Sequence, residues 1–539
     1  MLTYHAVQYF KRKKFFLLPA SPTPNGRMHL GHIAGPYLKM DVLKRKIQRG
    51  GGTALLVSGS DVYESHMESK ALQLGISTDE ACNKFHKLIL KDFEALDIEF
   101  DFFINPLDDE FRESFATREK ELLQNLVDSG KVIKKDEIFI FDSVQKKYLA
   151  GCWIKGNCPN CKATTSSYLC ENCGMHYRPI DIFDQKNYPD ANLYDAASLY
   201  LKLDFENLLE LINKVNNGSF TELFKQYIQI QGPYIRLTTP QETGIEWPVN
   251  DSEKQVIFSY TANLLAYVFF ADICKEKMKL KEHPLAKDSA YTSIVSFGVD
   301  TVLPFTAGLM GIGETLDHYK SFDYYISNYL YHLNGEKFST SRGNVIWGND
   351  IVSISGIQPD VVRYYLTKQN PEKETKNFDI NDFIDLVNTE LCGKHNKAIK
   401  EAIVSSSNSP HVLCQDLFNN LQEMLVQQNN YIEPPEFAFS KLLLPVELWV
   451  SSYLKMSKEA KKNNSYWWLK GYALLVYPVM PNISKKLWRS LCFENEINFE
   501  NFFIGNQLQE NIAPDVYFRE ISYEILEKCL PGKLQDLTN

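Results

Sequence analysis

The chain has 539 residues, a formal net charge of -9 and a hydrophobic fraction of 44%. This composition excludes a fibrous or intrinsically disordered protein, and the acidic balance argues against a protein that coats nucleic acid through bulk charge. The apolar run after the basic residues 11–14 is too short for a signal peptide, and no run reaches the roughly 18 residues that a membrane span needs. We therefore expect a cytoplasmic protein of several domains that does not enter a membrane.

Strand, turn and helix patterns alternate near the N-terminus. Residues 15–20 are expected to form a buried strand, residues 21–26 a turn, and an amphipathic helix follows from His29 to about Arg49. A second strand at residues 54–57 leads to another helix. Two such units in succession predict an α/β fold with a doubly wound parallel sheet of the Rossmann type, whose ligands bind beyond the carboxyl ends of the strands.

The rest of the chain predicts an insertion, the completion of the sheet and a helical domain. Short β-like runs surround a cysteine cluster between residues 131 and 177, and strand patterns at residues 256–258 and 294–297 are expected to complete the sheet. The pattern is helical after residue 379. The predicted segments are 1–120, the first half of the nucleotide-binding domain; 121–240, an insertion with a metal knuckle; 241–350, the second half with a polar loop; 351–379, a linking segment; and 380–539, an all-α helix bundle.

Four cysteines form two Cys-x-x-Cys pairs in the insertion, Cys158 with Cys161 and Cys170 with Cys173. Two such pairs eight residues apart predict a tetrahedral zinc site whose four thiolates leave no open position. The site is therefore expected to be structural and not catalytic. The other cysteines are scattered and are expected to be free thiols: Cys82, Cys152, Cys274, Cys392, Cys414, Cys492 and Cys529.

Two histidines lie three residues apart at the first strand-to-helix turn. His29 and His32 are expected on one face of the first helical turn, where the helix N-terminus favours anions, so both can donate to phosphate oxygens. Gly31 between them has no side chain and leaves room for an adenine ring against the backbone. Taken alone, a histidine pair on a helix is more often structural.

A polar loop bounded by glycines spans residues 334–344 and has Lys337 near one end and Arg342 near the other. Such a loop can close over phosphates and supply positive charge to a leaving pyrophosphate. Taken alone, an exposed turn is the simpler interpretation.

In this order, and about 300 residues apart, the two motifs resemble the HIGH and KMSKS signatures of class I aminoacyl-tRNA synthetases. The cysteine knuckle, with Gly59–Asp61 and Trp247–Val249, resembles the methionyl-tRNA synthetases in particular. The resemblance implies zinc in the knuckle, Mg²⁺-bound ATP and an amino acid as substrates, and tRNA as partner. It implies catalytic roles for His29, His32 and Lys337, and ATP binding by Gly31, Asp300, Ser339, Ser341 and Arg342.

The implied amino-acid pocket departs from the family where specificity is decided. Ser21 and Thr23 stand where methionyl enzymes have leucine and tyrosine, so the pocket gains hydroxyl groups that a thioether cannot pair. An amino acid other than methionine is therefore a serious alternative. Asp61 is expected to hold the α-ammonium group of the substrate. The full implied pocket is Ser21, Thr23, Asp61, Tyr260, Asn263, Tyr267 and Phe305.

The loop and the bundle also depart from the family. Thr340 replaces the second loop lysine, which predicts weakened or rearranged adenylation chemistry, with Arg342 as a substitute contact. Lys397 and Glu401 fall where the family reads the anticodon, and a carboxylate there is unfavourable for RNA. Normal anticodon reading is therefore doubtful.

Three functions remain open on the sequence. The first is an ATP-dependent aminoacyl-tRNA ligase of the methionyl type. The second is a related enzyme that activates a different amino acid for a biosynthetic pathway, and the third is a catalytically silent RNA-binding protein. Retention of both histidines, Lys337 and Asp61 argues against the third. We expect a monomer, because the chain ends soon after the bundle.

Overall fold

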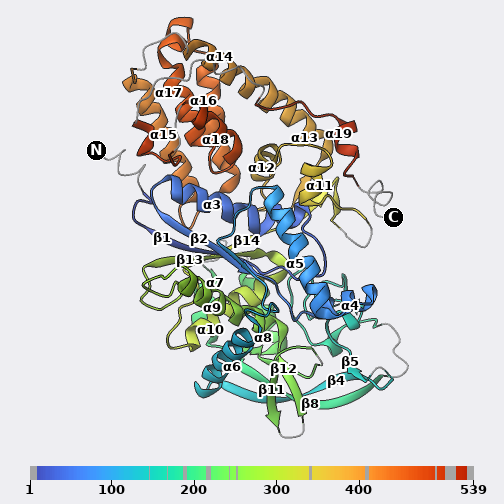
Figure 1. Cartoon of the computed structure of the whole chain (residues 1–539). Helices are drawn as coiled ribbons and strands as arrows, with labels where there is room; N and C mark the ends of the chain where they lie inside the picture. The colour runs from blue at the N-terminus through green and yellow to red at the C-terminus, as the bar shows by residue number, and fades with distance from the viewer. Residues whose placement is uncertain are drawn as a thin grey trace.

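The computed structural model is built around a five-stranded parallel sheet with strand order β14-β13-β1-β2-β3 (Figure 1). This confirms the prediction of a doubly wound Rossmann-type domain. The strands are β1 (Lys14–Pro19), β2 (Thr53–Gly59), β3 (Phe102–Ile104), β13 (Tyr291–Gly298) and β14 (Tyr324–Asn328). The structure describes residues 9–144, 146–166, 168–185, 191–213, 220–241, 243–250, 253–338, 343–406, 412–491, 495–503 and 517–530.

The central strand β1 explains why the sheet is covered on both faces. Phe15 and Leu17 join one buried apolar cluster, and Phe16 and Leu18 join another, because successive strand side chains point to opposite faces. Helices α3 (Leu38–Arg49) and α5 (Thr78–Ala95) contribute to the first cluster, and α9 (Ser259–Lys277) contributes to the second. Figure 1 shows α3 and α9 on opposite sides of the sheet.

The sequence prediction was wrong about one strand of the main sheet and missed two others, β3 and β14. Residues 253–257 form β12 (Glu253–Ile257) in a separate antiparallel sheet with β10 (Thr238–Thr239) and β11 (Glu246–Asn250). The edge of the main sheet is β14 instead, which pairs in parallel with β13. Apolar content alone does not say which sheet a strand joins, since that depends on pairing partners distant in sequence.

The insertion is larger and more regular than the predicted short strands. Strand β4 (Val132–Asp142) pairs antiparallel with β8 (Ala191–Lys202) along its whole length. Charged residues at 134–137 interrupt the apolar pattern of β4, and only four of its eleven positions are buried, which hides the strand from a pattern search. Strands β5 (Lys147–Tyr148) and β9 (Tyr234–Arg236) extend this sheet, and helix α6 (Arg112–Asp128) precedes it.

The helical C-terminal region follows the linking helices α11 (Gly348–Ser353) and α12 (Pro359–Lys368). Trp449 and Trp468 are buried and stack in parallel, and each indole N–H donates to the backbone carbonyl of the other residue, at 3.2 and 3.1 Å. These tryptophans therefore hold the bundle together. Its helices include α13 (Ile380–Leu386), α14 (Asn396–Ser406), α15 (Gln415–Ile432), α16 (Leu444–Leu454), α17 (Lys458–Val476) and α18 (Pro481–Ser490).

Arg363 joins the bundle to the nucleotide-binding domain. Its guanidinium is fully buried and donates to the carboxylate of Asp41 on α3 at 2.7 Å. The same side chain donates to the carbonyls of Leu96 and Asp97 after α5 and to that of Val479 before α18, at 2.7 to 3.1 Å. One side chain on α12 thus ties three separate segments together.

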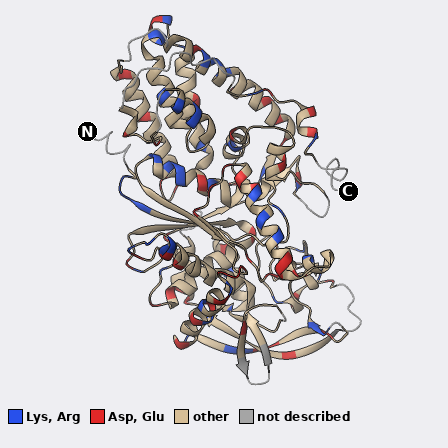
Figure 2. Cartoon of the chain, in the orientation of Figure 1, with Lys and Arg blue, Asp and Glu red and all other residues tan. Residues whose placement is uncertain are grey.

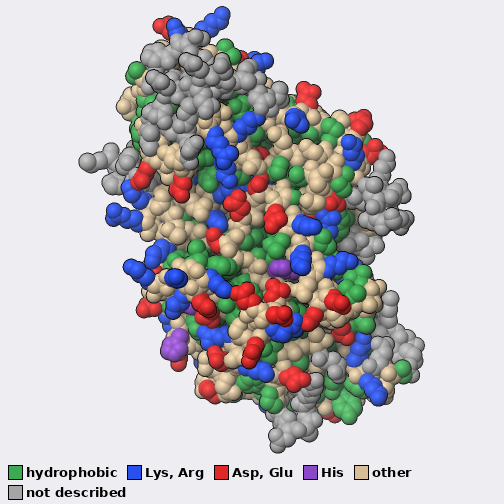
Figure 3. All heavy atoms as spheres, in the orientation of Figure 1, with side chains coloured by type: hydrophobic (Ala, Val, Ile, Leu, Met, Phe, Trp, Pro, Cys, Tyr) green, Lys and Arg blue, Asp and Glu red, His purple; other side chains and the backbone are tan. Residues whose placement is uncertain are grey.

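None of the helices described here is long and apolar enough to cross a membrane. Lys and Arg side chains occur on several bundle helices, including α14, α17 and α18 (Figure 2). On the face of the molecule in Figure 3, basic and acidic side chains are interspersed, so this face has no extended patch of one sign.

Glu119 on α6 is completely buried, and neither of its carboxylate oxygens has a hydrogen-bond partner within the described parts of the chain. Burial raises its pKa well above 4.5, so the folded protein holds a proton that the unfolded chain releases near pH 4.5. Stability is therefore lost as pH rises from about 4.5 toward the raised pKa. We predict that Glu119→Gln raises the free energy of unfolding at pH 8 by roughly 1–3 kcal/mol, and raises the melting temperature accordingly. At pH 4.5 the substitution should have little effect. Thermal unfolding at both pH values tests this, with the exposed Glu113→Gln as control.

Candidate active site

The first motif lies where β1 meets α2 (Leu30–His32), and His29 is the N-cap residue of this short helix. Its Nδ1 accepts the backbone N–H of His32 at 3.2 Å. An imidazole whose Nδ1 accepts a hydrogen bond carries its proton on Nε2, so His29 presents an N–H donor. The two imidazole rings stack with centroids 3.6 Å apart. The two histidines therefore lie together, as their spacing predicts, and their catalytic roles stay predictions.

Both histidines are held in the neutral form. Burial is the main cause that lowers the pKa of His29 well below 6.5, and the neighbouring His32 and Lys337 lower it further. The edge of His32 reaches solvent, but the surrounding protein desolvates the ring and lowers its pKa to about 4. Two neutral rings stack without charge repulsion, and each can donate to a phosphate oxygen.

The two motifs lie side by side in the fold. The Leu30 N–H donates to the Ile346 carbonyl at 2.9 Å, and the Gly348 N–H donates to the Met28 carbonyl at 2.9 Å. His29 and Trp347 form the β-bridge between these contacts. The segment after the second motif is therefore anchored directly to the first motif.

Arg27 makes unpredicted contacts that hold the first motif against helices α5 and α11. Its guanidinium pairs with Asp92 of α5 at 2.7 Å and with Asp350 of α11 at 2.8 Å. Asp92 also accepts the backbone N–H groups of Met28 and Asn349, at 3.0 and 2.8 Å. These contacts could not be predicted from the sequence, because the carboxylate partners of Arg27 lie 65 and 323 residues away.

Phe338 of the second motif covers the first motif. Its ring stacks on His29 with centroids 4.6 Å apart. A Cβ atom at Gly31 would lie 2.8 Å from the Phe338 ring, so a side chain at position 31 is excluded while Phe338 stays there. An adenine ring stacked on Gly31, as the sequence suggests, has to take the place of Phe338.

Lys337 lies on β16 (Glu336–Lys337), which pairs with β15 (Tyr331–Leu333). Its ammonium group donates to Glu171 of the cysteine knuckle at 2.7 Å. The remaining predicted loop residues, Ser339, Ser341 and Arg342, together with Thr340, lie outside the described residues.

Two carboxylates follow the carboxyl ends of β2 and β13, the two strands that flank β1 in the sheet. Asp61 comes after β2, and its backbone N–H donates to the Pro22 carbonyl at 3.0 Å, which ties it to the first motif. Burial raises the pKa of Asp61 well above its usual value, and Glu64 adds to this rise. Asp300 comes after β13, and burial followed by the charge of Glu171 raises its pKa to about 6. A bound cation would stabilise the charged form of both carboxylates and so lower both pKa values.

Part of the predicted amino-acid pocket is assembled at the same sheet edge. The Ser21 N–H donates to the Tyr267 hydroxyl at 3.4 Å, and Tyr267 lies against Phe305 with ring centroids 5.9 Å apart. The Ser21 hydroxyl is buried and has no hydrogen-bond partner in the described structure. Burial raises the pKa of Tyr267, so its phenol stays protonated. Thr23 lies in the adjoining turn, where its carbonyl accepts the N–H of Asn25.

Tyr260 and Asn263 lie on α9, seven and four residues before Tyr267. Tyr260 contacts His176 of the knuckle, with ring centroids 5.3 Å apart, and lines a cavity of about 60 Å³ with Leu264 and Pro304. Asn263 lies one turn along α9 and is partly exposed. The roles of Tyr260 and Asn263 stay predictions.

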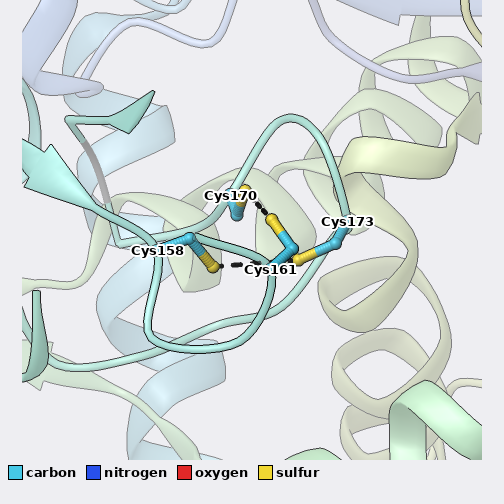
Figure 4. A group of neighbouring side chains, drawn as sticks. All are labelled: Cys158, Cys161, Cys170 and Cys173. Carbon is cyan, nitrogen blue, oxygen red and sulfur yellow. Dashed lines mark hydrogen bonds between the residues drawn. The ribbon is translucent and has the colours of Figure 1, made fainter. Parts of the chain in front are cut away.

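The four predicted zinc ligands converge (Figure 4). The Sγ atoms of Cys158, Cys161, Cys170 and Cys173 all lie within 4.8 Å of one another. This spacing fits four thiolates around one zinc ion, which would hold the knuckle together and leave no coordination position for a substrate. We predict about one zinc per chain, and its loss when Cys161 is replaced by Ser. Metal analysis after gel filtration measures this, and Cys152→Ser, outside the cluster, is the control.

The chain matches the family model of tRNA synthetases class I (M) over residues 16–402. It is 24% identical to the methionine–tRNA ligase of Borrelia hermsii, with 97% of this chain and 74% of that protein covered, and 24% identical to that of Methanopyrus kandleri, with 96% and 81% covered. The fold matches the methionyl-tRNA synthetase of Mycobacterium tuberculosis bound by methionyl-adenylate, with a TM-score of 0.71, 15% identity and 94% and 100% of the two chains covered. The chain therefore belongs to the class I tRNA synthetases of the (M) family.

Proposed function

We propose that this protein is an ATP-dependent aminoacyl-tRNA ligase of the methionyl type. The observation that supports this most is the anchoring of the first motif to the second, which brings His29, His32 and Phe338 into one site. The methionine–tRNA ligases among its relatives favour methionine as the amino acid. We also propose that the protein works in the cytoplasm as a monomer, with the five predicted segments as its domains.

The proposed reaction begins with adenylation. The carboxylate oxygen of the amino acid forms a bond to the α-phosphorus of Mg²⁺-bound ATP, and the bond to the bridging oxygen breaks, so pyrophosphate leaves. The Nε2–H of His29 and the ring of His32 donate to phosphate oxygens that gain charge, and Lys337 offsets that charge. Asp61 holds the α-ammonium group, which orients the carboxylate for attack. A terminal hydroxyl of tRNA then attacks the carbonyl, and AMP leaves.

The alternative substrate has one observation in its favour. The buried, unpaired hydroxyl of Ser21 next to Tyr267 would gain a hydrogen bond from a polar side chain and gains none from a methyl group. A related enzyme that activates a different amino acid for a biosynthetic pathway is therefore the second candidate. Its support is weaker, because the named relatives act on methionine.

The helical bundle carries exposed lysines suited to RNA phosphates, but the sequence predicts no residue there that recognises an anticodon base. Lys394, Lys397 and Lys400 are exposed at a three-residue spacing, which places them on one side of the helix. The Glu401 carboxylate accepts a hydrogen bond from the Lys461 ammonium group at 2.7 Å, so its repulsion toward phosphate is reduced. We propose that these lysines bind the phosphate backbone of tRNA, without the family's usual reading of the anticodon.

The decisive experiment is amino-acid-dependent exchange of labelled pyrophosphate into ATP, run over all twenty amino acids with and without total tRNA. Exchange with methionine, together with charging of tRNA, supports the first candidate. Exchange with another amino acid, or exchange without charging, favours the second. Absence of exchange with every amino acid contradicts both and leaves a catalytically silent protein.

A further inference from the structure

Glu171 is a carboxylate of the cysteine knuckle that contacts the catalytic loop. It lies between the ligands Cys170 and Cys173, and its Oε2 accepts a hydrogen bond from the Lys337 ammonium group at 2.7 Å. The two residues are 166 positions apart in sequence, so this contact exists only because the insertion folds back onto the nucleotide site. The proposed mechanism does not use Glu171.

The knuckle is fixed at this place by close packing. Gly174 has a φ of +72°, and a Cβ atom there would lie 2.7 Å from the carbonyl of Val299, next to Asp300. The Gly174 N–H donates to the Cys170 carbonyl at 2.8 Å, which closes the turn that contains Glu171. The turn therefore packs against the same segment that presents Asp300, and the position of Glu171 follows from the knuckle fold.

The charge of Glu171 changes the pKa of two residues near the proposed nucleotide site. It raises the pKa of Asp300 and opposes the lowering of the pKa of His32. The carboxylate contacts Lys337, and its charge acts on His32 and Asp300, which the proposed mechanism places near the triphosphate.

We propose that Glu171 competes with the triphosphate for Lys337: it holds the Lys337 ammonium group beside the nucleotide site until ATP binds and displaces the carboxylate. This inference rests on the proposed function. The Glu171 and Lys337 side chains are 64% and 46% exposed, and an ion pair this exposed contributes no more than about fivefold to an equilibrium constant. Lys337 can therefore exchange partners at little cost. Phosphate and Glu171 compete for one ammonium group, so ATP binding has to displace the carboxylate.

The test is calorimetric binding of Mg²⁺-bound ATP to the full chain. Glu171→Gln is expected to lower the Kd by about two- to fivefold, because Lys337 no longer has a competing partner. The kcat of pyrophosphate exchange is expected to stay within about twofold, since Lys337 has left Glu171 once the triphosphate is bound. Glu171→Asp is expected to restore the wild-type Kd. The matched control is Glu222→Gln on α8 (Thr221–Gln231), which removes another exposed carboxylate that pairs with a lysine, Lys225, at 2.8 Å.

A double-variant cycle separates the contact from general charge. In a Lys337→Gln background, Glu171→Gln is expected to leave the Kd for ATP unchanged. An equal gain in both backgrounds, or no gain in the single variant, overturns the proposal. Zinc content near one per chain in Glu171→Gln shows that the knuckle is intact. If wild-type protein binds ATP but supports exchange with no amino acid, the proposed function fails while the cycle still decides the role of Glu171; absence of ATP binding overturns both.

Discussion

Replacing His32 by Ala is expected to lower the rate of pyrophosphate exchange by about 100- to 1,000-fold, the usual effect of removing one donor to a charge that develops in the transition state. The local fold should survive, because the contact that caps α2 runs from the backbone N–H of His32 to the ring of His29 and does not use the His32 side chain. The loss is therefore expected in kcat, with thermal stability unchanged.

Steady-state exchange kinetics at saturating ATP and amino acid measure this effect. His318→Ala is the control, because His318 is exposed and lies outside both motifs, and it should retain wild-type kinetics. Wild-type turnover by His32→Ala would mean that the triphosphate is not held at the β1–α2 turn, and the proposed mechanism would have to be abandoned.

Replacing Arg363 by Met is expected to cost about 3 kcal/mol or more, because it removes the partner of a buried carboxylate and leaves several buried carbonyls without a donor. Burial alone raises the pKa of Asp41, but Arg45 and Arg363 together hold it below its usual value. Arg45, at 2.8 Å from Asp41, remains in the variant and limits the damage.

Thermal unfolding followed by circular dichroism should show a fall of roughly 6–12 °C for Arg363→Met, at about 2–4 °C per kcal/mol. The comparison variant is Arg178→Met, which removes an exposed ion pair with Asp181 and should shift the midpoint by no more than about 2 °C. Equal shifts for the two variants would show that the Arg363 contacts do not hold the domains together.

The parts of the fold that were predictable from the sequence are those with local causes. The buried run of β1, the turn with two histidines and the paired Cys-x-x-Cys spacing each follow from a few adjacent residues, and all three are confirmed. The edge strand β14 and the position of β12 depend on strand pairing between distant segments, so local patterns gave no signal for them. Strand β4 was hidden by its charged, partly exposed residues.

The same distinction applies to the site. His29, His32, Asp61 and Asp300 follow motif positions, and the structure places them at the carboxyl edge of the sheet. The partners of Arg27 and the contact between Glu171 and Lys337 arise from chain folding over 65 to 323 residues, which no spacing rule encodes. Phe338 was visible only as a loop residue, although its ring covers Gly31.

The nucleotide-binding domain and the helical region share one apolar interior. Leu17 of the central strand, Leu43 of α3 and Trp468 of α17 belong to a single continuous cluster of buried side chains. A chain truncated near residue 379 would therefore expose the apolar surface that the helical region covers, and it is expected to aggregate. Heating should unfold both regions in one transition. Exchanging this helical region for that of a distant relative would require new apolar side chains in the layer of the nucleotide-binding domain beneath it.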